Sequence, residues 1–402
     1  MPAQHLITRR RNLLVFLLAA ALQAVAFGIY ETGLPLYLSF VGISLMSMGV
    51  IFGVSQVGML AVRWFAGTGS DAAGRKPYYA AALGISSAAM CAIPVWTGAA
   101  AIAAVKTVRD MAGTMYDAVR PVAVYEEAGP RFMRWIGRVD GVIFTFIALG
   151  AVSTGLLIRS FGYRWPFVAA ATLGFAGTAV LLRGYKERRR HVARGPSLRF
   201  TDLFSFDLTP GMWTIVAANF IMNIGISTSH SFYLLLFFRD KFGFSVAALG
   251  LIQMLHRLSL GVPLFFSGAF MDRPSLRRHH MSIYIAAVLA QGMFITGTGL
   301  LPGALAAAAA FVLHDLVGAT FWGPINSSLI QANARPGRRG ADVSLVTGLS
   351  GLGWILGPLL AGWLTGPLGW LNGPFIVSGI ISAAGGLLML RLPLAREGRT
   401  NP

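Results

Sequence analysis

Long apolar runs constrain the fold of this chain more than any other feature of its sequence. Of its 402 residues, 55% are hydrophobic and 12% are charged, whereas about a quarter of a soluble domain is charged. Most of the runs approach or exceed the roughly 20 residues that a helix needs to cross a bilayer. They predict twelve transmembrane helices, over residues 12–40, 44–66, 78–97, 100–126, 138–158, 165–184, 210–236, 246–270, 281–300, 303–330, 343–365 and 372–391. The predicted class is therefore an all-α integral membrane protein.

The distribution of basic residues predicts how the chain is oriented. The formal net charge is +18, and 24 of the 33 Lys and Arg residues fall in the two tails and in the connections that follow even-numbered runs. Only four lie in the opposite connections. Because basic loops stay on the cytoplasmic side, we expect a multi-pass protein of a cell membrane, the bacterial inner membrane, with both termini in the cytoplasm. The basic residues are explained by their placement on one side of the lipid bilayer, so no nucleic-acid partner is expected.

The two halves of the chain repeat each other. Residues 36–71 align without a gap on residues 237–272, and further along Arg109–Gly113 align on His314–Gly318. The repeat predicts two pseudo-symmetric six-helix bundles, over residues 1–184 and 210–402, joined by a basic cytoplasmic linker over residues 185–209. Parallel repeats of this kind place the substrate between the halves, near mid-membrane. The first run also has the basic flank of a cleavable signal peptide, but the repeat needs it as its first helix.

A polar stretch, GTGSDAAGRKP, separates the second run from the third over residues 67–77. We predict that it is a cytoplasmic turn that acts as a gating latch, stabilising one access state. A glycine lets helices approach closely, and a carboxylate can cap the N-terminus of a facing helix. The alternative is that its bases only anchor the topology. The predicted latch comprises Gly67, Asp71, Gly74, Arg75 and Lys76, with Gly268, Asp272 and Arg273 from the second copy.

These loop residues resemble the signature of the major facilitator superfamily, which reads Gly, three residues, Asp-Arg, one residue, Gly-Arg-Lys. The sequence departs from it at Ala72, where the family has Arg. Arg109, four residues before Gly113, resembles the family's fourth-helix motif, whose Arg is tied to proton coupling. The resemblance covers the whole chain and implies a secondary transporter in which two bundles rock about a central cavity. The family's antiporter pattern is incomplete, since Thr154 and Gly155 replace its Gly-Pro step, so the direction of transport stays open.

Ionisable side chains within the apolar runs are functional candidates, because charge at membrane depth is expensive. Four of them lie on one stripe of the fourth run, and the others are scattered over the first, seventh, eighth and tenth runs. Structural ion pairs are the alternative for the charged residues, and a lone buried histidine is more often a satisfied interior residue. The predicted coupling and substrate cavity comprises Glu31, Lys106, Arg109, Asp110, Asp117, His230, His256, Arg257, His314 and Asp315.

These features predict a transporter that moves a small solute by alternating access, with the proton as coupling ion. We expect Asp110 or Asp117 to exchange the proton beside Arg109. Two alternatives stay open. One is a metal-ion or other inorganic-ion carrier that uses the histidines and acids, since imidazole and carboxylate bind metals. The other is a sensor or scaffold with the transporter fold that no longer transports.

An enzyme is not expected. The sequence contains no nucleotide-binding loop, no metalloprotease HExxH motif and no nucleophile elbow. Cys91 is the only cysteine, which excludes a disulfide framework and a CxxC metal site. No cofactor is therefore predicted.

Overall fold

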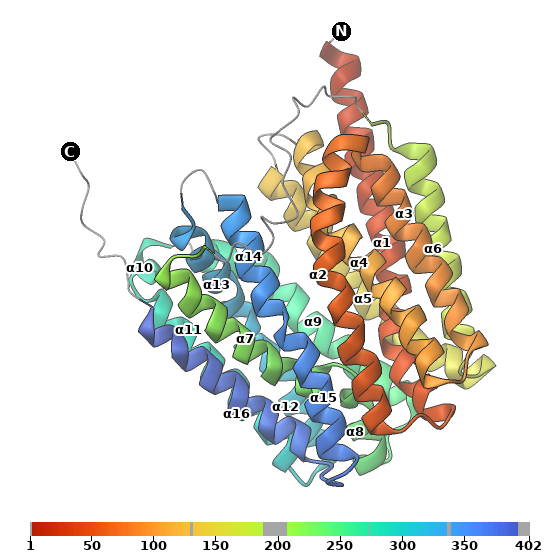
Figure 1. The fold of residues 1–402 in the computed structure, drawn as a ribbon, viewed down its shortest axis with the longest axis vertical. Helices are drawn as coiled ribbons and strands as arrows, with labels where there is room; N and C mark the ends of the chain where they lie inside the picture. Colours follow the sequence, from red (N-terminus) through yellow and green to blue (C-terminus); the bar gives the residue numbers. More distant parts are fainter. Residues whose placement is uncertain (1, 129–131, 188–206, 272, 336–338, 393–402) are drawn as a thin grey trace.

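The computed structural model describes residues 2–128, 132–187, 207–271, 273–335 and 339–392. Over these residues the chain is helical and contains no strand. The helices form two bundles of six membrane spans, one from each half of the sequence (Figure 1). This arrangement confirms the predicted fold class, while the residue boundaries of the two bundles and the linker between them stay predictions.

In the first bundle each span is one long helix. α1 packs against α5 and α6, and α4 packs against α2 and α3. The helices are α1 (Pro2–Phe40), α2 (Leu45–Ala73), α3 (Arg75–Ala92) with a 3-10 turn η1 (Ile93–Val95), α4 (Ala99–Ala128), α5 (Phe132–Phe161) and α6 (Trp165–Gly184).

In the second bundle three of the spans are broken into two helices each. The pairs α7 and α8, α12 and α13, and α14 and α15 each make one span. The helices are α7 (Pro210–His230), α8 (Tyr233–Phe242), α9 (Val246–Met271), a short α10 (Pro274–Arg277), α11 (His280–Leu300), α12 (Ala304–Val317), α13 (Ala319–Asn333), α14 (Arg339–Gly351), α15 (Gly353–Thr365) and α16 (Gly373–Leu387), which continues as the 3-10 turn η4 (Leu388–Arg391).

The seventh span departs from the single helix that was predicted over residues 210–236. α7 and α8 meet at an angle of 43° across Ser231 and Phe232. In the last turns of α7, the side chains of Ser227, Thr228 and His230 hydrogen-bond to main-chain carbonyls three or four residues earlier. Such local bonds compete with the helical ladder and bend helices. The apolar pattern alone does not reveal this break.

Two of the twelve spans are more polar than the rest. Among the described residues, nine helices are long and apolar enough to cross a membrane, and the bent pair of α7 and α8 is a tenth. The apolar part of α2 is shorter than a membrane span and covers Leu45–Met59. α4 carries several charged side chains, of which Lys106, Arg109 and Asp110 are buried inside the protein. Burial away from lipid is what allows a charged helix to occupy a membrane position.

The polar stretch between α2 and α3 is not an eleven-residue turn, so that prediction is wrong. α2 continues through Ala73 and α3 begins at Arg75, which leaves Gly74 alone between the two helices. Gly74 has φ 98°, a conformation that glycine reaches without strain. One residue of this kind reverses the chain, and the flanking residues stay helical.

The bundles contact each other along two helix pairs, α2 with α15 and α5 with α9. In the first pair, a Cβ on Gly49 would lie 2.5 Å from the Pro358 carbonyl oxygen, and one on Gly362 would lie 3.0 Å from the Leu45 carbonyl oxygen. In the second pair, a Cβ on Gly155 would lie 2.6 Å from the Val246 carbonyl oxygen. Glycine therefore permits main chain to meet main chain in both interfaces, as the repeat implies.

A group of aromatic side chains, which we call the aromatic plug, joins the bundles. It lies toward the end of the molecule opposite to the N-terminus, where α2, α15 and α8 converge (Figure 1). Phe52 of α2 contacts Phe232 across the two bundles, with ring centroids 5.6 Å apart. The contact is backed by stacked and edge-on rings of α8, α12 and α16, most of them fully buried. The aromatic plug comprises Phe52, Phe232, Tyr233, Phe237, Phe238, Phe311 and Phe375.

Candidate functional site

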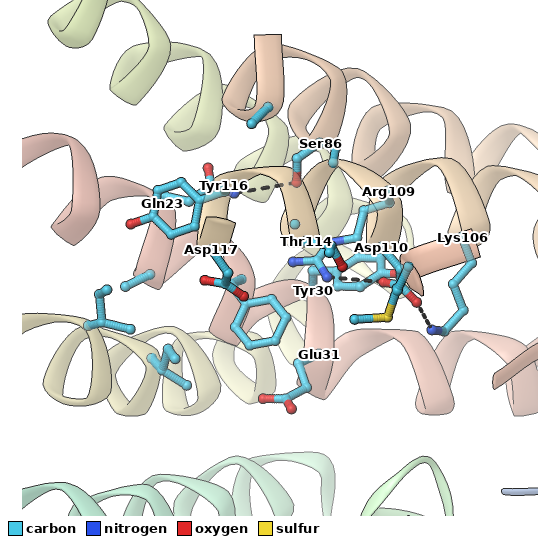
Figure 2. Close-up of a pocket in the computed structure, with 18 of the residues that line it drawn as sticks. Gln23, Tyr30, Glu31, Ser86, Lys106, Arg109, Asp110, Thr114, Tyr116 and Asp117 are labelled. Carbon is cyan, nitrogen blue, oxygen red and sulfur yellow. Dashed lines mark hydrogen bonds and ion pairs between the residues drawn. The ribbon is translucent and has the colours of Figure 1, made fainter. Parts of the chain in front are cut away.

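A cavity of about 670 Å³ lies between the two bundles. Its walls come mainly from α1, α4 and α5, with Trp354 and Pro358 of α15 and His230 and Ser231 of the α7–α8 break on the other side. A volume in this range accommodates a small molecule. Figure 2 shows the first-bundle wall, where polar side chains gather. The charged residues that line the cavity are Glu31, Lys106, Arg109, Asp110, Asp117, Arg120 and Asp140.

The centre of this wall is a buried ion network on α4, which we call the α4 cluster: Lys106, Arg109 and Asp110. The Asp110 carboxylate pairs with the Lys106 ammonium and accepts from Nη1 of Arg109 at 3.1 Å. Nζ of Lys106 also donates to the Ser55 hydroxyl, 2.8 Å away. Figure 2 shows the three charged side chains in a row along one helix. Two cations therefore share one anion at the cavity wall.

Aromatic rings hold both cations of the α4 cluster. The Arg109 guanidinium lies over the rings of Phe27 and Tyr30, 4.5 and 4.7 Å from their centroids. Nζ of Lys106 lies 4.4 Å from the centroid of Phe52. A cation over a ring face is stabilised by the ring quadrupole, by about 2 kcal/mol where water is excluded. The rings therefore fix the cations in position without neutralising them.

Several polar atoms on this wall have no hydrogen-bond partner among the described residues. They include Nε of Arg109 and the hydroxyls of Tyr30, Thr114 and Tyr116. A buried polar group left unsatisfied costs about 1–3 kcal/mol. All four residues line the cavity, but these particular atoms are themselves shielded from it, so this conformation leaves them without a partner among the described residues.

The predicted stripe on α4 divides into two groups. Asp110 lies in the α4 cluster against Arg109, whereas Asp117 pairs with Arg120 at 3.7 Å. Arg120 is held more tightly by Asp140 of α5, at 2.6 Å. The side chain of Asp117 is 56% exposed, against 7% for Asp110. Of the two candidate carboxylates, only Asp110 is enclosed together with Arg109.

An ion pair joins the two bundles beside the cavity. Nη2 of Arg257 on α9 donates to Oε1 of Glu31 on α1 at 2.6 Å. The two side chains are 19% and 28% exposed, so solvent screens the pair only partly. Both residues were predicted separately as cavity residues, and the structure brings them together across 226 positions of sequence.

Three predicted histidines come together in the second bundle, which we call the histidine cluster: His230, His256 and His314. They come from α7, α9 and α12, and one ring nitrogen of each lies within 4.8 Å of those of the other two. Asp315 accepts from Nε2 of His256 at 2.9 Å and lies 3.2 Å from Nε2 of His314. His256 and His314 are buried, and His230 lines the cavity.

The described part of the predicted latch holds α3 to its neighbours. Arg75 donates to Glu126 of α4 at 3.1 Å and to the Ser70 hydroxyl at 2.6 Å. Nζ of Lys76 donates to the Tyr185 carbonyl at 2.8 Å. Glu187 accepts from the main-chain N–H groups of Arg75 and Lys76, that is, from the N-terminus of α3. An anion there is stabilised by the helix dipole.

The structure describes the other latch residues less completely. Gly67 and Gly268 lie within α2 and α9, and Asp71 lies within α2, but the surroundings of these positions fall outside the described part of the chain. Asp272 lies outside the described residues. Arg273 is exposed, with its guanidinium 5.0 Å from the ring centroid of Phe270. Glu126 and Glu187 were not among the predicted latch residues, although acidic residues among so many bases are a signal that points to ion pairs there.

A central cavity between two pseudo-symmetric helical bundles, with charge buried on its wall, defines a membrane transporter. The sequence matches the Major Facilitator Superfamily over residues 16–341. The chain belongs to this superfamily of transporters, as its loop and fourth-helix residues indicated. No curated protein matches the sequence.

Solved transporter structures share the fold over nearly the whole chain. The nucleoside transporter NupG is 15% identical, with 94% of this chain and 98% of that chain covered and a TM-score of 0.74. A bacterial homolog of the human lysosomal transporter Spinster, in an inward-facing and unoccupied conformation, is 14% identical, with 96% and 95% covered and a TM-score of 0.73. The human organic anion transporter MFSD10 is 17% identical, with 95% and 99% covered and a TM-score of 0.68.

Proposed function

We propose that the chain is a secondary active transporter that moves a small polar solute by alternating access and uses proton exchange as its driving reaction. The observation that carries the proposal is the enclosed α4 cluster on the wall of a solute-sized cavity between the bundles. Family membership supports the transporter class over an enzyme. The membrane environment follows from the apolar spans.

Asp110 is the carboxylate that we assign to proton exchange. When ionised, it neutralises one of the two positive charges that Lys106 and Arg109 bring to the cavity wall. When protonated, it leaves both cations free to bind a solute. Proton binding and solute binding at this wall are then linked, because each changes the charge that the other encounters. This linkage is what a coupled transporter requires.

We infer that the structure is closed on its external side. The aromatic plug and the contacts of Gly49 and Gly155 join the bundles at the end opposite to the N-terminus, and the distribution of basic residues favours cytoplasmic termini. Opening that end requires the bundles to separate there. Reporter fusions at the C-terminus and after Arg164 test the orientation, since the first should be cytoplasmic and the second external.

The deciding experiment measures flux in proteoliposomes that contain the purified protein. Solutes are screened by counterflow, which needs no driving force, starting with a nucleoside and an organic anion because the solved relatives include transporters of both. A solute that exchanges is then tested for uptake driven by a pH gradient, with Asp110→Asn as the variant and Asp240→Asn, at an exposed ion pair on α8, as the matched control. We expect the Asp110 variant to lose pH-driven uptake and the control to keep it.

The same measurement separates the alternatives. A protein with no counterflow of any solute would favour the sensor or scaffold. Counterflow that is indifferent to a pH gradient in the wild type would contradict proton coupling while leaving the transporter class intact. Metal-ion flux in the absence of solute flux would favour the metal-ion carrier.

A further inference from the structure

The histidine cluster poses a hydrogen-bonding problem that neutral imidazoles do not solve. Nδ1 of His230 lies 3.0 Å from the Ile226 carbonyl oxygen, and Nδ1 of His314 contacts the Phe311 carbonyl oxygen. A carbonyl oxygen only accepts, so in both rings Nδ1 carries the hydrogen. The Ser229 hydroxyl, 2.7 Å from Nδ1 of His230, fits this assignment because a hydroxyl can also accept. Nε2 of each neutral ring is then a bare acceptor.

Those bare acceptors face one another. The two Nε2 atoms of His230 and His314 are 2.9 Å apart, and Oδ1 of Asp315 lies 3.2 Å from Nε2 of His314. Two bare ring nitrogens and a carboxylate oxygen therefore lie close together, and the Gln291 amide, which donates to Oδ1 of Asp315 at 3.4 Å, supplies no hydrogen to the two nitrogens. Bringing acceptors this close in a buried place is unfavourable unless a positive charge lies among them. That charge is either a proton on one ring or a metal cation.

His256 distinguishes between these two. Nε2 of His256 donates to Oδ2 of Asp315 at 2.9 Å, so Nδ1 is its bare atom. The ring is 2% exposed, and Nδ1 has no hydrogen-bond partner among the described residues. A proton shared by His230 and His314 leaves this atom unsatisfied, whereas a metal ion can use all three rings.

We propose that His230, His256 and His314 form a binding site for a divalent transition-metal ion of the Zn²⁺ type. Nδ1 of His230 and of His314 donates to a main-chain carbonyl, and Nε2 of His256 donates to Asp315. A hydrogen bond from the second ring nitrogen is the arrangement that orients metal-ligating histidines. Imidazole nitrogens prefer zinc, copper, iron and nickel over calcium or magnesium. Bonds of about 2.0–2.1 Å place tetrahedral ligands about 3.3 Å apart. One ring nitrogen of each histidine already lies within 4.8 Å of one in each of the other two, so the proposed site requires the side chains to shift to this spacing.

The ion is a resident of the second bundle and not the transported solute. All three ligands come from the second bundle, so no residue of the first bundle is needed to bind the ion. His256 and His314 lie behind the cavity wall, and only His230 lines the cavity. Asp315 accepts from Nε2 of His256 and so orients its ring. This inference goes beyond the proposed transport function and does not depend on it.

Binding is tested on the purified full-length protein in detergent, carrying a tag without histidines. Calorimetry measures Zn²⁺ binding, and Co²⁺ substitution reports the geometry through the intense visible absorption of tetrahedral Co²⁺. We expect one site per chain with that absorption in the wild type. Loss of a ligand in His256→Gln or His230→Gln should lower the affinity by about 100-fold or more, and Asp315→Asn by about 10–100-fold, as for other outer-shell carboxylates.

His279→Gln is the matched control, because His279 is exposed at the start of α11 and should leave the affinity unchanged. Co²⁺ spectra of the wild type need no variant, so a variant that fails to fold does not decide the question. Wild-type protein without stoichiometric binding at neutral pH would overturn the proposal in favour of a protonated imidazole. Binding that survives in all three variants, or that His279→Gln removes, would overturn it too.

Discussion

The α4 cluster and the histidine cluster occupy corresponding places in the two bundles, yet their chemistry differs. The repeat aligns Arg109 and Asp110 with His314 and Asp315. In the first bundle the aspartate is held by permanent cations, a guanidinium and an ammonium. In the second it is held by imidazoles, which are neutral when unprotonated. The two halves thus share a buried aspartate at this position of the repeat, but the side chains that contact it differ.

The difference between the clusters is also one of access. Arg109, Asp110 and Lys106 line the cavity, whereas His256, His314 and Asp315 lie behind its second wall. The ion pair of Glu31 with Arg257, which we call the bridge between the bundles, joins two residues that are adjacent in sequence to residues that belong to or contact the two clusters. Glu31 follows Tyr30, whose ring lies under Arg109, and Arg257 follows His256. A change at either cluster is therefore one residue away from the contact that joins the halves.

The largest effect is expected from removing the permanent positive charge of Arg109. Arg109→Gln should abolish pH-driven uptake, a loss of about 100-fold or more, because the guanidinium is replaced by a neutral group that cannot balance Asp110. Uptake and the amount of inserted protein are measured in the same vesicles. Arg109→Lys is the control, and it should retain part of the activity because it keeps the charge without the planar donors. Unchanged uptake in Arg109→Gln would reduce the α4 cluster to a structural ion network.

The second test separates the two carboxylates of α4. Asp110→Asn should lower pH-driven uptake by more than about tenfold while solute counterflow persists, because the proton site is lost and the cavity is kept. Asp117→Asn should have a smaller effect, since Asp117 is largely exposed and pairs with Arg120. Both variants are compared by counterflow and by uptake driven by a pH gradient. The reverse order of effects would move the proton site to Asp117.

Much of the fold could be predicted from the sequence because the bilayer imposes strong rules on it. Apolar length, basic loops and the repeat each report a constraint that acts on every span. The break between α7 and α8 and the helical continuation of α2 to Ala73 escaped prediction. Both depend on single residues, Gly74 at a positive φ and a few local side-chain bonds before Ser231. A hydropathy pattern averages over many residues, so it does not reveal features that depend on one or a few of them.

The candidate site was predictable in composition but not in pairing. The cost of burying charge pointed to Glu31, Arg257, the histidines and the α4 residues one by one. Which of them meet depends on how helices that are far apart in sequence pack against each other. The pairing of Glu31 with Arg257 and the convergence of His230 with His314 are of this kind. Tyr30 stands out in the sequence only as a polar residue beside Glu31, and Ser55, which also contacts the α4 cluster, gives no signal because it carries no charge.

The third test acts on the bridge between the bundles. Glu31→Gln should change the uptake rate by a few-fold, which corresponds to about 1 kcal/mol, because the pair with Arg257 is partly exposed and stabilises one access state only modestly. Arg257→Gln should change it in the same direction. The exchanged pair Glu31→Arg with Arg257→Glu should recover part of the wild-type rate. Failure of both single variants to alter the rate would mean that the bridge does not bias the access states.

The smallest expected effect lies farthest from both clusters. Asp71→Asn should lower uptake by about twofold to threefold with normal insertion, because the predicted latch biases conformations and does not build the cavity. Expression and flux are measured together, with Lys76→Gln, at the start of α3, as the comparison within the predicted latch. A variant with full flux would leave the stretch between α2 and α3 as a topology signal only. A loss of uptake as large as that of Asp110→Asn would contradict the proposal that the latch only biases conformations.

The aromatic plug has a further consequence, for the electrical tightness of the membrane. A membrane that stores energy as an ion gradient is discharged by any continuous file of water molecules, since protons pass along it faster than any solute. The rings of Phe52 and Phe232 meet across the bundles, and Phe232 is 1% exposed, so apolar surface joins the bundles at this point. Apolar constrictions exclude water and ions without a charged barrier. If the chain transports by alternating access as proposed, we expect this conformation to resist ion leak, with charge crossing only when access changes.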